Sequence, residues 1–148
     1  MIALIQRVSE ARVEVAGKLV AAIGPGLLAL VGVARVDTMR EAARLAERLL
    51  QYRIFADENG RMNRDLRATG GELLLVPQFT LVADTRKGNR PSFSRAAPPA
   101  QGRAVLDALA AHCAAAYPRV KTGRFGAEMR VSLTNDGPVT FWLEVDPQ

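Results

Sequence analysis

Hydrophobic and polar positions alternate along several short stretches of the chain, and this pattern predicts a strand-rich protein. Residues 11–16 place Val13 and Val15 on one face and charged neighbours on the other, as in a half-buried strand. Residues 27–34 and 73–76 are almost continuously apolar, which indicates strands that are covered on both faces. Further strands are predicted over the apolar or alternating residues 1–8, 19–23, 52–55, 129–133 and 139–145.

Two segments follow the helical period instead. Thr38 and Glu41 form a T-x-x-E capping box at the start of the first helix. The second helix follows Gly102 and runs to about Tyr117, where Pro118 ends it. Strands and helices alternate too rarely for a doubly wound sheet, so the pattern predicts the α+β class. We expect a barrel-like or two-sheet core with two main helices packed outside, in a single domain over residues 1–148.

Composition and charge limit the kinds of partner and the cellular compartment that we expect for the protein. The chain has a net charge of +5, which permits a nucleic-acid partner without requiring one. It contains one cysteine, which excludes an internal disulfide and fits a reducing cytosol. No signal peptide is predicted at the N-terminus, and no apolar run approaches the roughly 18 residues of a membrane span. We therefore expect a soluble, basic, cytoplasmic protein that does not enter a membrane.

Several kinds of catalytic centre are excluded by the residues that the chain lacks. His112 is its only histidine and directly precedes Cys113 in the second predicted helix. Neighbouring side chains on a helix point about 100° apart, so the two do not form a nucleophile pair. No further Cys or His completes a zinc site, and no glycine-rich phosphate-binding loop is present. We expect neither a metal nor an organic cofactor.

The stretch from residue 72 to 93 is the strongest candidate for a site. An apolar strand over residues 73–76 leads into Pro77, the Gln78 amide and the Thr80 hydroxyl, followed by a basic loop. Strands that present polar groups at their ends often carry functional sites. An ordinary edge strand with a solvated loop fits the same residues. Thr80 has no obvious base, and its hydroxyl could equally bond to neighbouring backbone.

Taken together, four motifs resemble those of one family. They are the family's SQFTL strand, which reads PQFTL at 77–81, an N-x-G-P-V-T turn at 135–140, RPSF at 90–93 and TGRF at 122–125. The whole chain resembles D-aminoacyl-tRNA deacylase, an enzyme that hydrolyses D-amino acids from mischarged tRNA. This resemblance implies a carboxylic ester hydrolase whose partner is the 3′-terminal aminoacyl-adenosine of tRNA.

The resemblance also implies how the site is built. The family is a homodimer with its active sites at the subunit interface. A cis Gly137–Pro138 peptide reaches into the partner's site, where its carbonyl groups occupy the space that an L side chain would need. Arg7 fixes this turn. The other implied site residues are the catalytic-pocket residues Gln78, Phe79 and Thr80, and the adenosine-side residues Phe125 and Met129.

The implied reaction is ester hydrolysis assisted by the neighbouring ribose hydroxyl of the tRNA. An aminoacyl ester is already activated, and the protein backbone holds it in position. Weak catalytic assistance is therefore enough for its hydrolysis, and no histidine is required. Glycine has no side chain to clash, so activity on glycyl-tRNA(Ala) is implied as well. Pro77 departs from the serine that is usual in the family. We expect this change to tune the rate, and the proline to lie at an edge, a bulge or an unused N–H position.

Two other functions compete with this interpretation. A non-catalytic RNA-binding module would use a phosphate-binding surface made of Arg86, Lys87, Arg90, Arg95 and Arg124. A small-molecule acyl hydrolase would instead use Thr80 as its nucleophile. The first predicts binding of tRNA whatever amino acid it carries, and the second predicts cleavage of simple esters.

Overall fold

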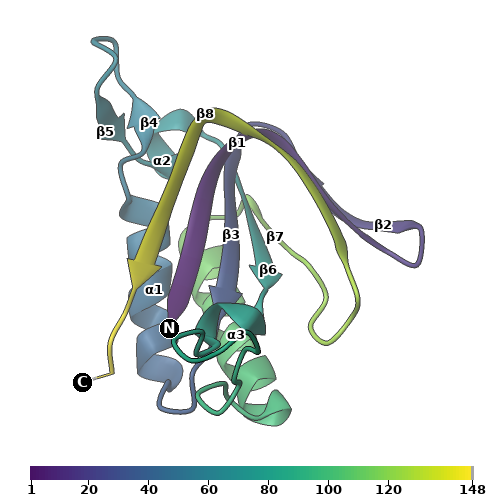
Figure 1. Ribbon diagram of the computed structural model, residues 1–148. Helices are drawn as coiled ribbons and strands as arrows, with labels where there is room; N and C mark the ends of the chain where they lie inside the picture. Colours follow the sequence, from purple (N-terminus) through teal and green to yellow (C-terminus); the bar gives the residue numbers. More distant parts are fainter. Residues whose placement is uncertain (148) are drawn as a thin grey trace.

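The computed structural model describes residues 1–147 as strands packed against helices (Figure 1). In chain order the elements are β1 (Ile2–Val15), β2 (Lys18–Ile23), β3 (Gly26–Gly32), α1 (Met39–Gln51), β4 (Phe55–Ala56), β5 (Met62–Arg64), α2 (Leu66–Thr69), β6 (Glu72–Pro77), the 3₁₀ turn η1 (Phe79–Val82), α3 (Pro99–Ala116), β7 (Val120–Thr122) and β8 (Arg130–Glu144).

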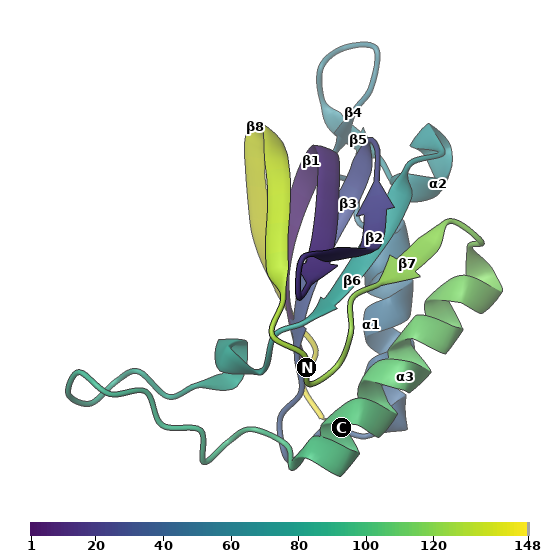
Figure 2. The ribbon, with the colours of Figure 1, turned by 90° about the vertical axis from the view of Figure 1, so that its right-hand side faces the viewer.

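Strand β1 organises the six-stranded main sheet. It pairs antiparallel with β3 through its first half, with β2 through its second half, and with β8 along its other edge. Strand β6 lies parallel between β3 and β7, and β4 and β5 form a separate small sheet. The main sheet curls into a nearly closed barrel, with α1 and α3 together against one side (Figure 2). The predicted α+β class, with a barrel-like core and two main helices outside, is confirmed; the homodimer stays a prediction.

Polar side chains join β2 to β6 and β7 where the barrel curls round. The Lys121 ammonium donates to the Ala22 carbonyl oxygen at 2.6 Å and lies 3.3 Å from the Glu72 carboxylate. Glu72 also accepts from the Gly24 backbone N–H at 3.2 Å, and this bond holds the pKa of its carboxyl below the ordinary value. Side chains therefore connect the β2 end to β6 and β7, with which β2 forms no backbone ladder.

The described residues form two large apolar cores and a third, small cluster of Ile2, Val82 and Ala96; β3 and β6 contribute to both large cores. Leu27 and Leu73 face the helices and belong to the larger core, which also contains Leu109 of α3. Their successors Leu28 and Leu74 face the barrel interior. A strand that is buried on both faces has no polar positions, which accounts for the continuous apolar runs in these two segments.

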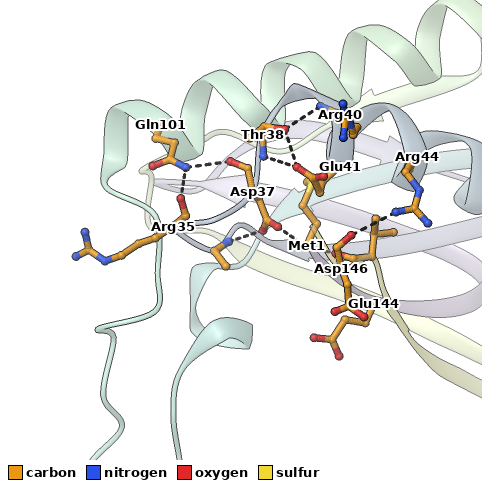
Figure 3. Close-up of polar contacts among 12 residues, drawn as sticks. Met1, Arg35, Asp37, Thr38, Arg40, Glu41, Arg44, Gln101, Glu144 and Asp146 are labelled. Atoms are coloured by element: carbon orange, nitrogen blue, oxygen red, sulfur yellow. Dashed lines mark hydrogen bonds and ion pairs between the residues drawn. The ribbon is translucent and has the colours of Figure 1, made fainter. Parts of the chain in front are cut away.

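The start of α1 is fixed by polar contacts that the sequence predicted in part (Figure 3). The Thr38 backbone N–H and hydroxyl both donate to Glu41 Oε2, at 2.7 and 2.6 Å, so the predicted capping box is confirmed. Beside it, the Gln101 amide donates to the carbonyl oxygens of Arg35 and Asp37, at 2.8 and 3.0 Å. The beginning of α3 is thereby attached to the segment that leads into α1.

Several local predictions were wrong. The strands predicted over 1–8 and 11–16 are one strand, β1, and the second helix begins at Pro99, before Gly102. The strand predicted over 52–55 is the two-residue β4, which starts at Phe55. Thr80 lies in the 3₁₀ turn η1 rather than in a strand. The strands predicted over 129–133 and 139–145 are one continuous strand, β8, and the tight turn predicted between them is a bulge in that strand. Because β1 pairs with the residues on both sides of the bulge, the chain continues in the same direction there.

Candidate active site

A cavity of about 750 Å³ opens at the end of β6. Its walls come from five segments: the end of β3 with the residues after it, the end of β6 with the start of η1, the segment before α3, the first two turns of α3, and the β7–β8 loop with the start of β8. Four of the predicted site residues line it together, namely Gln78, Phe79, Phe125 and Met129. Residues nearly fifty positions apart in the sequence thus meet in one pocket.

Gln78 is held at the point where β6 ends. Its backbone N–H donates to the Val31 carbonyl oxygen at 2.7 Å, which continues the β3–β6 ladder by one residue. Its side-chain amide donates to the hydroxyl of Thr80, which is exposed and does not line the cavity. The partner of the Thr80 hydroxyl is therefore a hydrogen-bond donor, whereas a nucleophilic hydroxyl needs an acceptor that takes its proton.

Pro77 occupies a position where the sheet needs no N–H. Backbone amides of even-numbered β6 residues face β3, since Glu72 donates to Pro25 and Gln78 to Val31. Odd-numbered positions, Pro77 among them, face β7, and β7 already ends at Thr122. The expectation that this proline replaces an N–H unused by the ladder is confirmed, and the proline therefore leaves the β6 pairing intact.

Two aromatic rings form an exposed apolar wall of the cavity. The Phe79 and Phe93 ring centroids lie 5.1 Å apart with the planes inclined by 53°. The two residues are 57% and 40% exposed, high values for large apolar side chains. This wall is suited to contact with an apolar part of a ligand or of another subunit.

The opposite wall carries Phe125 and Met129. The Arg103 guanidinium of α3 lies over the Phe125 ring, 5.0 Å from its centroid. The Met129 sulfur accepts from the Arg124 backbone N–H at 3.4 Å, and a Cβ on Gly123 would come within 3.0 Å of that sulfur. Both pocket side chains are thus positioned by neighbours outside the cavity.

Gly137 and Pro138 form the exposed part of the β8 bulge. Residues 136–139 lie opposite the single residue Arg7, because Asn135 and Thr140 pair with the residues on either side of Arg7. The Gly137–Pro138 peptide bond is cis, and Gly137 has a φ of +150°. A Cβ at Gly137 would lie 2.6 Å from Val139 Cγ2, so glycine suits this position on steric grounds as well.

Side chains on both sides fix the shape of this bulge. Arg7 Nε donates to the Asp136 carbonyl oxygen at 2.8 Å, and its Nη1 donates to the Ile54 carbonyl oxygen at 2.9 Å. Asn135 Oδ1 accepts from the Val139 backbone N–H at 2.7 Å, and its amide donates to Thr140 Oγ1 at 2.9 Å. The bulge therefore presents backbone at the surface in a defined conformation.

The bulge and the cavity lie at different points along β1, the cavity near its beginning and the bulge near its middle. Pro77, at the cavity, pairs with Val31, which pairs with Ala3 of β1. Arg7 is four residues further along β1, about 13 Å at the rise of an extended strand. Neither Arg7, Gly137 nor Pro138 lines the cavity of its own chain. The structure thus separates the predicted site residues into two groups.

Several residues that line the cavity were missed as site residues. Phe93 was noted only as part of a motif, and Pro98 and Pro99 only as parts of a loop before the second helix. Arg35 and Gly102 also line the cavity and carried no local signal, because tertiary packing alone brings them there. A pocket formed by five segments is visible in a sequence only where a segment carries its own motif.

The lone histidine and cysteine take no part in the pocket. His112 is exposed on α3, whereas Cys113 is buried in the larger core, and burial raises the pKa of its thiol to about 12. Within residues 1–147, no three His, Cys, Asp or Glu side chains are grouped so that they could hold a metal ion. None of the helices described in that range is both long and apolar enough to cross a membrane.

Known proteins resemble this chain over almost its full length. A family model described as D-Tyr-tRNA(Tyr) deacylase matches residues 4–144. A protein of Thioalkalivibrio sulfidiphilus named D-aminoacyl-tRNA deacylase is 65% identical, over 99% of each chain. One of the same name from Azotobacter vinelandii is 62% identical, over 97% of this chain and 99% of its own. The solved structure of a c-Myc DNA unwinding element binding protein is 36% identical with a TM-score of 0.94, over 99% of each chain. The chain belongs to the D-Tyr-tRNA(Tyr) deacylase family.

Proposed function

We propose that the protein hydrolyses the ester bond of D-aminoacyl-tRNA. The observation that carries this proposal is the cavity at the end of the QFTL segment, in a chain that belongs to this deacylase family. The products are a free D-amino acid and a tRNA with a free 3′-terminal hydroxyl. This editing reaction belongs in the cytoplasm, where aminoacyl-tRNA is used.

The pocket supplies position and hydrogen-bond donors. The backbone N–H group of Phe79, which lines the cavity, stands at the start of η1, and the first amides of a helical turn have no acceptor within it. We assign it to the carbonyl oxygen of the ester, whose negative charge grows as water attacks. The neighbouring 2′-hydroxyl of the terminal ribose assists the attacking water. Phe125 and Met129 receive the terminal adenosine.

Selection against L-aminoacyl esters is assigned to the Gly137–Pro138 bulge of a second subunit. Support comes from the exposure of this bulge and from its separation from the cavity of its own chain. In a homodimer, the Gly137 and Pro138 carbonyl groups of one subunit fill the space beside the ester in the other. An L side chain would collide with them, while a D side chain points away. Glycine collides with nothing, so glycyl-tRNA(Ala) is a substrate as well.

A comparison of D- and L-tyrosyl-tRNA tests the proposed function. We expect rapid release of D-tyrosine and little release of L-tyrosine above the spontaneous rate. Comparable rates on both would refute chiral selection. Tight binding of tRNA without ester cleavage would instead favour a non-catalytic RNA-binding module.

Two further measurements test the mechanism. Replacing the terminal 2′-hydroxyl of the tRNA with hydrogen should reduce turnover by orders of magnitude. The Thr80→Ala variant should retain much of its activity, since the Thr80 hydroxyl lacks a base. Unchanged turnover on the 2′-deoxy substrate together with a complete loss in Thr80→Ala would restore Thr80 as the nucleophile.

A further inference from the structure

A long arm, defined here as residues 83–98, projects from the body of the protein beside the cavity (Figure 2). Asp84 and Ser92 join its two legs through a pair of backbone hydrogen bonds, at 2.8 and 3.0 Å. Gly88 lies at the tip with a φ of +62°, which favours glycine. The second leg is attached to the body, where the Ala97 backbone N–H donates to the Val33 carbonyl oxygen at 3.0 Å.

Positive charge is concentrated on this arm. Between residues 84 and 95, four basic side chains stand against one acidic side chain, a net charge of +3. Arg86 is neutralised locally, because its Nε and Nη2 donate to the Asp84 carboxylate at 2.9 and 2.7 Å. Within residues 1–147, the side chains of Lys87, Arg90 and Arg95 have no ion-pair or hydrogen-bond partner. Lys87 and Arg90 are thus available to a ligand, whereas the charge of Arg95 also helps to lower the pKa of the Asp84 carboxyl.

These cations lie close to the mouth of the cavity. Phe93, at the foot of the second leg, lines the cavity and its ring contacts that of Phe79. Arg90 lies three residues from Phe93 towards the tip of the arm, which is at most about 10 Å along an extended chain. Lys87 lies six residues from Phe93 in the same direction, at most about 20 Å. A ligand that fills the cavity and continues outward as a polyanion would pass them.

We propose that the arm binds the phosphate groups of the tRNA strand that leads to the 3′-terminal nucleoside. The proposal rests on the proposed function, because it takes the terminal aminoacyl-adenosine to occupy the cavity. Lys87 and Arg90 contact the phosphates that precede this nucleoside, and Arg95 lies nearer the mouth. A second copy of this chain is a poorer partner for the arm, since each copy carries a net charge of +5. The arm reads no base and increases the affinity for any tRNA strand.

The test uses the Lys87→Gln/Arg90→Gln double variant of the full chain. Two substrates are compared, D-tyrosyl-tRNA and D-tyrosyl-adenosine, which has no phosphate groups. On tRNA, kcat/KM should fall about tenfold at low salt, and its log–log salt dependence should become shallower by about 1.4, at about 0.7 per single-strand phosphate contact. On D-tyrosyl-adenosine, kcat/KM should not change.

The matched control is Arg61→Gln/Arg67→Gln, which removes the same charge from exposed positions at the β4–β5 end, far from the arm (Figure 1). An equal loss of salt dependence in this control would overturn the proposal, as would an unchanged slope in the arm variant. So would a change of oligomeric state in the arm variant by sedimentation, because the arm would then contact another subunit. If the wild type cleaves neither ester, the proposed function fails, and salt-dependent binding of uncharged tRNA still tests the arm.

Discussion

The Arg7 side chain links the β8 bulge to the segment just before β4. Its guanidinium donates to the Asp136 carbonyl oxygen on one side and to the Ile54 carbonyl oxygen on the other. Guanidinium groups bond two acceptors in a fixed planar geometry, whereas an ammonium group acts as a single point charge. The conformation of the bulge therefore depends on arginine at this position, and positive charge alone is not sufficient.

We expect Arg7→Lys to lose at least tenfold in kcat/KM on D-tyrosyl-tRNA and about 2 kcal/mol of stability, the usual range for a hydrogen bond to a charged group. Steady-state kinetics and urea unfolding would measure the two effects. Arg12→Lys on the same strand is the control, because Arg12 pairs with Glu14 at the surface. Equal effects in both variants would contradict the role assigned to Arg7.

Among the elements, α1 owes its start to a local motif that can be tested directly. The Thr38 hydroxyl bond holds the pKa of the Glu41 carboxyl below its ordinary value. A carboxyl with a lowered folded-state pKa stabilises the fold above its unfolded pKa of about 4.3. That stabilisation is lost as the pH falls through the folded-state pKa.

We expect Thr38→Ala to destabilise the protein by about 1 kcal/mol near neutral pH. The difference from wild type should shrink as the pH falls through the lowered folded-state pKa of Glu41, where its carboxyl becomes protonated. Urea unfolding at neutral and at acidic pH measures it, with Thr85→Ala in the arm as a control that leaves the α1 cap intact. If the destabilisation by Thr38→Ala did not change with pH, the Thr38 cap would stabilise α1 independently of the Glu41 charge.

Elements governed by local rules could be predicted, and those governed by pairing could not. The capping box and the end of the second helix before Pro118 depend on neighbouring residues, and both are found in the structure. The bulge at 136–139 depends on β1, which pairs with the strand on both sides of Arg7. Asn, Asp, Gly and Pro in succession favour a turn in any local interpretation. Only the register with β1 shows that the strand continues.

On the scale of the whole molecule, the separation of the bulge from the cavity gives the proposed dimer a sharp test. Gln78→Ala should disable the cavity, and Gly137→Ala should displace the bulge, because its Cβ would clash with Val139. Each variant alone should be nearly inactive on D-tyrosyl-tRNA. If the two groups act across subunits, unfolding and refolding the variants together at equal amounts should restore about one quarter of the wild-type sites.

The mixture distinguishes two arrangements. A heterodimer would hold one intact site, formed by the cavity of one variant and the bulge of the other. No recovery in refolded mixtures that contain heterodimers would show that the cavity and the bulge of one chain act together. Wild type refolded in the same way is the control for losses during the procedure.

Only those residues of the site that belong to a sequence motif could be predicted. Gln78 and Phe79 belong to one motif and Phe125 to another, and the structure brings them together. Arg35 and Gly102 have no motif of their own, since they reach the cavity through the packing of α3 on the sheet. The arm was recognised as a basic loop, but its projection beside the cavity is a property of the fold.

The two cores that share β3 and β6 affect how the sequence can change. Each residue of these strands faces one core or the other, so residues 27–31 and 73–76 have no solvent-facing position at which a polar residue could be accepted. Strand β8 has many exposed positions, and outside the bulge at 136–139 these positions can accept polar residues. As lineages diverge, the middle of the sheet should therefore change slowly and only among apolar residues, while the exposed positions of β8 outside the bulge change more often.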